Sequence, residues 1–217
     1  PLDDTSTHLG PDLWPMFRQV SEELLILNPY FIPGHDGVAA LTEAVSRGAR
    51  VIVLTNSLAS NDVAIVHGHY AKYRKALLRA DVELFELRVD RPTSTSSDLA
   101  DEGDEAHMSL HVKTFIFDRK KTFIGSLNLD PRSVYQNTEL GVVVEDATMA
   151  EEIATITIAR LPDIAYEVGL DEGDRLFWLG RDPVTHEITR YQREPNASIF
   201  QRVLAAISRV LPVEGQL

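Results

Sequence analysis

Three short runs of mostly apolar residues, at positions 24–28, 51–54 and 82–87, alternate with two stretches of helical periodicity. Short apolar runs are typical of buried strands, and apolar residues spaced by three or four indicate amphipathic helices. A strand, a helix and a second strand in this order form a βαβ unit with parallel strands and a right-handed crossover. Two such units in succession therefore predict an α/β fold with parallel strands at its centre.

The two crossover helices have recognisable start and stop signals. The first is expected to begin at a cap on Asp36 and to end at Gly48, a residue that suits the left-handed position after a helix. The second and longer helix is expected to begin at Asn61 or Asp62 and to continue to about Arg79. Both would lie against the sheet through one apolar face.

The rest of the chain extends this pattern. Residues 88–108 are polar and acidic, and we expect a mobile loop or lid there. Further elements are expected as strands at 109–117, 122–124 and 139–144, helices at 10–22 and 149–161, a hairpin within 175–192 and a closing helix at 197–210. The sequence therefore predicts one α/β domain over 1–217. Its sheet is expected to be mixed and largely parallel, with helices on both faces and a C-terminal hairpin and helix.

Composition narrows the possible partners. The formal net charge is −12 and there are no cysteines, which excludes disulfides and thiolate–metal sites. An acidic chain repels polyphosphates, so no nucleic acid partner is expected. The one dense basic run, at 119–121, is typical of a solvated hairpin turn. His67 and His69 have no third ligand at zinc spacing, so no metal site is expected.

The strongest functional signal is an H-x-K pattern at His111 and Lys113, followed at fixed offsets by D and by G-S-x-N. Side chains two apart on a strand share a face, so these two would project together, about 7 Å apart. An imidazole can attack phosphorus or protonate a leaving alkoxide, and an ammonium can neutralise developing charge. The alternative is a solvated strand face with an ordinary histidine and lysine. The downstream residues favour a phosphodiester site.

Those downstream residues are small or polar. Gly125 would allow a tight turn and leave room for a phosphate. Ser126 and Asn128 can donate hydrogen bonds to phosphoryl oxygens. Asp118 has the opposite strand parity from His111, so it is expected to order the turn or support the site without touching substrate.

This spacing resembles the HKD motif of the phospholipase D superfamily. The stretches NPYFIPG, RGARVIVLTNSLASNDVAIVHGHYAKYRKALL and DPRS extend the similarity over nearly the whole chain, to the C-terminal half of bacterial cardiolipin synthases, particularly the third type. The resemblance implies a phospholipase D-like fold, a phospholipid substrate and transfer of a phosphatidyl group through a phosphohistidine, with no metal or cofactor. Hydrolysis of a phospholipid or other phosphodiester is the alternative. A third reading is a half that only binds anions or acts as a scaffold.

The superfamily brings two HKD motifs to one active site, and this chain contains one. Either an N-terminal half, favoured by the start at Pro1, or a second copy of the chain is expected to supply the other histidine. By resemblance to the second half, His111 would then be the general acid and base. The family pairs a carboxylate with the motif histidine. Glu139, 28 positions after His111, is the candidate, and a strand-edge charge is the alternative.

Three aromatic residues are candidates for an apolar wall beside a lipid. Tyr30 and Phe31 follow a strand end, where α/β sites often form, and Tyr70 shares a helix face with His67. Aromatic core packing is the alternative. The apolar runs are too short to span a bilayer. The resemblance implies a bacterial protein in peripheral contact with a membrane, cytoplasmic or at the inner-membrane face.

Overall fold

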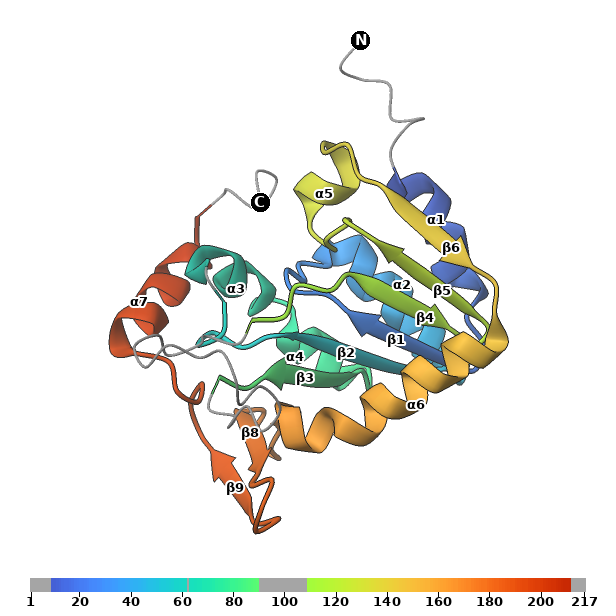
Figure 1. The fold of residues 1–217 in the computed structure, drawn as a ribbon. Helices are drawn as coiled ribbons and strands as arrows, with labels where there is room; N and C mark the ends of the chain where they lie inside the picture. Colours follow the sequence, from blue (N-terminus) through green and yellow to red (C-terminus); the bar gives the residue numbers. More distant parts are fainter. Residues whose placement is uncertain (1–8, 62, 90–108, 212–217) are drawn as a thin grey trace, which may run out of the picture.

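A computed structural model describes residues 9–61, 63–89 and 109–211. Its centre is one sheet of nine strands in the order β6-β5-β4-β1-β2-β3-β7-β8-β9 (Figure 1). The strands are β1 (Glu23–Leu27), β2 (Arg50–Asn56), β3 (Glu83–Leu87), β4 (Thr114–Phe117), β5 (Lys121–Gly125), β6 (Gly141–Val144), β7 (Ala165–Leu170), β8 (Leu176–Arg181) and β9 (Ile188–Tyr191). The helices are α1 (Leu9–Gln19), α2 (Gly34–Ser46), α3 (Ala64–Tyr70), α4 (Arg74–Arg79), α5 (Pro131–Tyr135), α6 (Ala147–Ile164) and α7 (Ile199–Ser208).

The two predicted βαβ units form the middle of this sheet. β1 pairs with β2 and β2 with β3, both in parallel, which confirms the predicted pairing. The other six pairings are antiparallel. The prediction of a largely parallel sheet was therefore wrong, although the sheet is mixed. The parallel neighbours β1, β2 and β3 are joined by helical crossovers, whereas the antiparallel neighbours β4 and β5 are joined by a tight turn.

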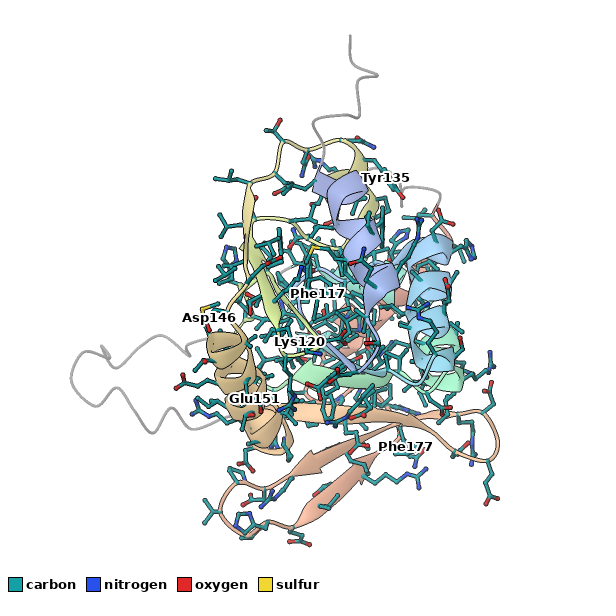
Figure 2. All side chains as sticks on the ribbon, turned by 90° about the vertical axis from the view of Figure 1, so that its right-hand side faces the viewer. Phe117, Lys120, Tyr135, Asp146, Glu151 and Phe177 are labelled. Atoms are coloured by element: carbon teal, nitrogen blue, oxygen red, sulfur yellow. The ribbon has the colours of Figure 1, made fainter. Side chains whose placement is uncertain are left out.

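Helices cover both faces of the sheet, as predicted. Neighbouring residues of β1 point to opposite faces: Leu24 and Ile26 join the core under α1, α2 and α4, whereas Leu25 and Leu27 join the core under α6. Figure 2 shows this arrangement along the sheet, with α6 on one side and α1 and α2 on the other. Asp146, labelled there, caps α6 by accepting hydrogen bonds from the backbone of its first turn.

The crossover helices differ in detail from the prediction. The expected long helix over 61–79 is two helices, because α3 tightens into i→i+3 hydrogen bonds, such as Tyr73 N to Tyr70 O at 2.9 Å, before α4 begins. Gly48 has a φ of +98°, which confirms the left-handed stop. Asp36 is not the cap of α2, since the helix already begins at Gly34 and Asp36 lies in its first turn.

The C-terminal hairpin (β8 and β9) and the closing helix α7 are confirmed. β7 was not predicted. It follows α6 without a loop and pairs with β3, which attaches the hairpin to the main sheet. The predicted acidic loop at 88–108 falls almost entirely on residues 90–108, which are outside the described residues. Among the described helices, none combines the length and apolar character needed to cross a membrane.

Candidate functional site

The motif residues lie at the edge of the sheet where the parallel strands end. β4 runs antiparallel to β1, so that Thr114, the first residue of β4, pairs with Leu27, the last of β1. β5 ends at Gly125, beside Lys113, and the Gly125 amide donates to the Lys113 carbonyl at 3.1 Å. The segment before β4 and the loop after β5 therefore meet at the carboxyl edge of β1 and β2, the usual location of sites in α/β sheets.

His111 and Lys113 are not on a regular strand, contrary to the prediction for 109–117. β4 begins only at Thr114, because β1 ends at Leu27 and the chain then turns away at Pro29. The segment before β4 therefore has no β1 partner there, and on its other side Lys113 accepts a hydrogen bond from the Gly125 amide. Val112, which lies between His111 and Lys113, is exposed.

Two buried asparagines hold the two site segments in place. Asn56, the last residue of β2, accepts from the Leu110 amide at 2.8 Å and donates to its carbonyl at 3.3 Å. Asn28, just after β1, donates to the Leu127 carbonyl and accepts from the Leu129 amide, both at 3.1 Å. Each side chain thus bonds the backbone as a neighbouring strand would. The sequence analysis missed both, although a polar residue closing an apolar parallel strand was the available signal.

Lys113 lies in a partly enclosed, negatively charged setting. Its Nζ donates to the carbonyl oxygen of His111 at 3.0 Å. Burial lowers the pKa of Lys113 below its ordinary value, against the opposing charges of Glu139 and Asp130. Asp130 caps α5, and burial raises the pKa of its carboxyl group. The cation therefore stays near two carboxylates that limit how far its pKa falls.

Glu139 contacts the motif through Ser126. The Ser126 hydroxyl donates a short hydrogen bond to the Glu139 carboxylate, and Asn137 Nδ2 donates to the same group at 3.2 Å. The Ser126 and Leu140 amides anchor this corner, with Leu140 N donating to Ser126 Oγ at 3.0 Å. Within the described residues, no hydrogen bond joins Glu139 to His111. The predicted pairing of these two side chains is therefore not formed in this structure.

The other motif positions have distinct surroundings. A Cβ on Gly125 would lie 2.5 Å from the Leu140 carbonyl oxygen and 2.8 Å from the Phe123 ring, so this glycine is required where β5 and β6 approach each other. Asn128 Oδ1 is buried and has no hydrogen-bond partner among the described residues. Since rotation of an amide exchanges its oxygen and nitrogen, this side chain has hydrogen-bonding capacity left for a ligand. His111 is exposed, with no side-chain hydrogen bond in the described part of the chain.

Asp118 is at the far end of β4 from the histidine. Seven residues of extended chain separate it from His111, a span of about 23 Å. Its carboxylate accepts from the Ser21, Glu22 and Glu23 amides at 2.8–3.2 Å and from the Ser21 hydroxyl at 3.2 Å. Burial would raise the pKa of Asp118, but these hydrogen bonds outweigh it and lower the pKa. Asp118 thus anchors the chain entering β1, at the opposite end of β4 from His111.

Asp118→Asn is expected to lower the free energy of unfolding by about 2 kcal/mol at pH 7, because an amide cannot accept this set of charge-assisted hydrogen bonds. The pKa of Asp118 is lower in the folded state than in the unfolded state. The carboxylate therefore stabilises the fold at pH values above its unfolded pKa of 3.8, and this stabilisation is lost as the pH falls through the folded pKa. The difference in unfolding free energy between wild type and variant should therefore narrow as the pH falls below 3.8. Urea unfolding at several pH values measures it.

The matched control is Asp36→Asn. Asp36 is exposed and has no hydrogen bond or ion pair among the described residues, so this change should leave the free energy of unfolding nearly unchanged. At temperatures where Asp118→Asn remains folded, its turnover should stay near that of wild type. Lost turnover at full stability would instead place Asp118 in the chemistry.

The aromatic candidates are mostly core residues. Phe31 and Tyr70 are buried with ring centroids 6.0 Å apart, and Tyr30 is half-buried against the same core. A separate cavity of about 330 Å³ lies beside the motif loop. It is lined by Trp14, Ile32, Pro33, Gly34, His35, Asp36, Leu129, Asp130, Pro131, Val134 and Tyr135. This mainly apolar cavity, next to Asp130, offers the kind of wall that those aromatics were expected to form.

The site therefore places an exposed imidazole, an ammonium, a hydroxyl and an amide with spare capacity on two segments that meet at one edge of the sheet. Such groups can exchange a proton with substrate and hold an anion. In the described part of the chain, no three His, Cys, Asp or Glu side chains are grouped so as to hold a metal ion.

Comparison with known proteins agrees with this geometry. Residues 13–159 match the model of the family "Cardiolipin synthase, PLD-like domain". The chain is 43% identical over 207 residues to "Cardiolipin synthase C" of Escherichia coli, covering 94% of this chain and 43% of that protein. It is 28% identical to "Cardiolipin synthase A" of Proteus mirabilis over 163 residues, which cover 74% of this chain and 29% of that protein.

Among solved structures, the fold is similar to that of a phospholipase D family member, Nuc from Salmonella typhimurium. The TM-score is 0.56 at 15% identity, covering 73% of this chain and 90% of that one. The similarity to phosphatidylserine synthase from Haemophilus influenzae has a TM-score of 0.51 at 17% identity, and it covers 69% of this chain and 35% of that one. The chain spans less than half the length of the curated relatives it matches. Because the family model matches more than half of the residues of this chain, the chain belongs to the family of cardiolipin synthase, phospholipase D-like domains.

Proposed function

We propose that this chain forms one half of the active site of a phosphatidyltransferase that makes cardiolipin. The observation that carries the proposal is the 43% identity to "Cardiolipin synthase C" over 94% of the chain. The site geometry supports it, because an exposed histidine and a half-buried lysine share one segment at the edge of the sheet. The proposal extends to phospholipid substrates and to peripheral contact with a bacterial membrane.

The proposed reaction has two proton transfers, both at His111. A histidine of the other half attacks the donor phosphorus, so that a P–N bond forms, the P–O bond to the leaving alcohol breaks and His111 protonates the alkoxide. In the second step the acceptor hydroxyl gives its proton to His111 and attacks the phosphohistidine, so that a new P–O bond forms, the P–N bond breaks and the other histidine is released. Lys113 and Asn128 would hold the phosphoryl oxygens meanwhile. The exposure of His111 supports this role, because its ring is open to incoming alcohols.

An uncovered apolar patch beside the motif supports the proposed second half. Its members are between 40% and 79% exposed: Val112, Ile124, Leu140 and Val142. Ile124 and Val142 are direct partners across β5 and β6, and the other two flank them on the adjoining segments. Apolar patches next to an incomplete site are typical of protein interfaces. The relatives are more than twice as long as the match, so an additional half, or a second copy, is the occupant that we propose.

The product formed from labelled phosphatidylglycerol tests the proposed function. We expect the full-length protein to make cardiolipin, with phosphatidylethanolamine added or omitted to identify the second substrate. The isolated 217-residue chain, diluted until monomeric, should be slower by about 10²-fold or more, since it lacks the other histidine. Phosphatidic acid as the product would instead establish hydrolysis. If the full-length protein formed no product, both transfer and hydrolysis would be overturned. Full turnover by the monomeric isolated chain would overturn the half-site.

A further inference from the structure

The outer face of α7 is apolar and has no cover among the described residues. Four side chains on this face, together with Val210 in the turn that follows the helix, are between 51% and 81% exposed: Ile199, Phe200, Val203, Ile207 and Val210. They recur at the three- and four-residue intervals that place side chains on one side of a helix. Figure 1 shows α7 at the margin of the molecule, beside α3. This set of five residues is called the α7 stripe below.

The orientation of α7 is held by close packing on its inner side. Ala205 and Ser208 are buried, and the helix backbone there approaches Gly68 of α3. A Cβ on Gly68 would lie 1.8 Å from Ser208 Oγ and 2.5 Å from the Ala205 carbonyl oxygen, so the two helices are in direct backbone contact. A Ser198–Gln201 capping box defines the start of α7. The helix therefore cannot rotate to bury the α7 stripe without losing this contact.

Positive charge is concentrated in the same part of an acidic chain. Segments 63–80 and 195–211 contain four and two Lys or Arg residues, and no Asp or Glu, in a chain with a net charge of −12. The first segment contains α3 and α4, the second contains α7, and α7 packs on α3. Arg74 is buried, and Lys75 and Arg79 pair with Asp174, so Arg202 and Arg209 are the cations of these segments that lie closest to the α7 stripe in sequence.

A cleft along one flank of α7 gathers part of this charge. Its volume is about 770 Å³, and its lining is Lys75, Arg175, Leu176, Trp178, Gln192, Arg193, Glu194, Arg202, Ala205, Ala206 and Arg209. Five of these are cations and one is a carboxylate. That carboxylate, Glu194, is already engaged by the buried Arg74 and by His67.

Two arginines of the cleft have incomplete partners. Arg209 Nη2 lies 3.9 Å from Glu194, and burial together with the charge of Arg74 lowers the pKa of Arg209. Arg202 donates through Nη2 to the Glu194 carbonyl at 2.8 Å, while its Nε is buried and has no partner within the described residues. Because the two arginines are seven residues apart, they lie on the same flank of α7, next to the α7 stripe.

The geometry points to the α7 stripe and its arginine cleft as the surface that rests on an anionic phospholipid bilayer. The apolar side chains would enter the boundary between headgroups and acyl chains, and the arginines would meet lipid phosphates. The inference rests on the proposed function in one respect, that a phospholipid substrate brings the protein to a membrane. α3 follows β2 at the edge of the sheet where the motif lies, so lipid bound here would be near the site.

The charge distribution distinguishes this surface from the uncovered patch beside the motif. In the Val112, Ile124, Leu140 and Val142 patch, Val112 is next to a cation, Lys113, and Leu140 is next to a carboxylate, Glu139, so the neighbouring charges have opposite signs. This patch also adjoins the half-site that a second half must complete. An apolar helix face with arginines along one flank instead matches an anionic lipid surface, in which apolar and negatively charged layers lie next to each other.

Vesicle sedimentation tests the inference with the full 217-residue chain. We expect stronger binding to phosphatidylcholine vesicles that contain about one-third phosphatidylglycerol than to phosphatidylcholine alone, and weaker binding at about 1 M salt. The double variant Phe200→Gln, Ile207→Gln should weaken binding about tenfold or more. Arg209→Gln should weaken it about fivefold.

Matched controls lie on other surfaces. Ile188→Gln on β9 and Lys120→Gln in the β4–β5 turn are exposed changes of the same types, and both should bind as wild type does. Equal binding to both kinds of vesicle, or no effect of the α7 variants, would overturn the inference. So would a dimer that the double variant converts to monomer in light scattering, because the α7 stripe would then be an interface between copies.

The inference and the proposed function fail separately. His111→Ala should bind vesicles as wild type does. In the full-length protein, the α7 double variant should retain transfer on detergent-dispersed lipid. Vesicle binding without any product would defeat the proposed function alone, and transfer without α7-dependent vesicle binding would defeat the inference alone.

Discussion

In the full-length protein, His111→Ala is expected to lower kcat by about 10²- to 10⁴-fold, the rate factor attributed to a positioned acid or base. The free energy of unfolding should not fall. The imidazole is exposed and forms no side-chain hydrogen bond in the described part of the chain, so its removal costs the fold little. Steady-state transfer of labelled phosphatidylglycerol measures the first quantity, and urea unfolding of the same preparation measures the second.

His186→Asn is the control for this experiment. His186 is also exposed, and asparagine tolerates its φ of +59°. Both activity and unfolding should match wild type in this variant. If His111→Ala keeps full activity, the assignment of the site fails. If the variant is unfolded under the assay conditions, turnover is measured at a lower temperature where it is folded. Full turnover at that temperature would also refute the assignment.

The largest expected effect on stability is at Arg74. This side chain is 1% exposed and lies between two carboxylates, donating to Glu86 at 3.0 Å and forming a short ion pair with Glu194. The guanidinium also packs over the rings of Tyr70 and Trp178, 5.4 Å and 5.3 Å from their centroids. Arg74→Met is expected to cost about 3–5 kcal/mol of unfolding free energy, because it leaves the carboxylate of Glu86 buried without its counter-charge.

Chemical denaturation measures this loss, with Arg79→Met as the control on the same helix. Arg79 pairs with Asp174 at the surface, so its replacement should leave the unfolding midpoint nearly unchanged. Adding Glu86→Gln to Arg74→Met should recover part of the loss, since the buried charge is then gone. Equal destabilisation by Arg74→Met and Arg79→Met would contradict the role of a buried ion pair.

The pH dependence of the same variant has a defined sign. Burial would raise the pKa of Glu194, but the hydrogen bond from His67 and the charge of Arg74 lower it far below its ordinary value. Glu194 therefore stabilises the wild type above its unfolded pKa of 4.5 and loses this effect as the pH falls through the folded pKa. The gap between wild type and Arg74→Met should be widest near neutral pH and narrow in acid.

The parallel centre of the fold could be predicted because its strands are short runs of mostly apolar residues and its crossovers are amphipathic. The limits of the elements depend on neighbours that a local pattern does not contain. The strand expected at 109–117 shortens to β4 because β1 ends at Leu27. β7 was missed because it follows α6 directly, without a turn signal to mark its start.

The sequence predicted which residues gather at the site better than it predicted which of them contact one another. Lys113 and Ser126 do approach the same corner as Glu139, but Glu139 accepts from Ser126 and not from His111. Asn28 and Asn56 hold the two site segments through bonds across 54 to 101 positions of sequence. Arg74, one of several arginines in the chain, is the one that the fold buries between carboxylates, and no sequence period marks it.

The outer side of β6 affects how the isolated chain behaves in concentrated solution. β6 is the last strand at one end of the sheet, and its four residues, GVVV, contain neither a charge nor a proline. Its outward amide and carbonyl groups can template a strand from another molecule, and nothing in its composition opposes this. Purified material is therefore expected to aggregate along β6 at high concentration, and a lysine in place of Val143 is the simplest way to keep it dispersed.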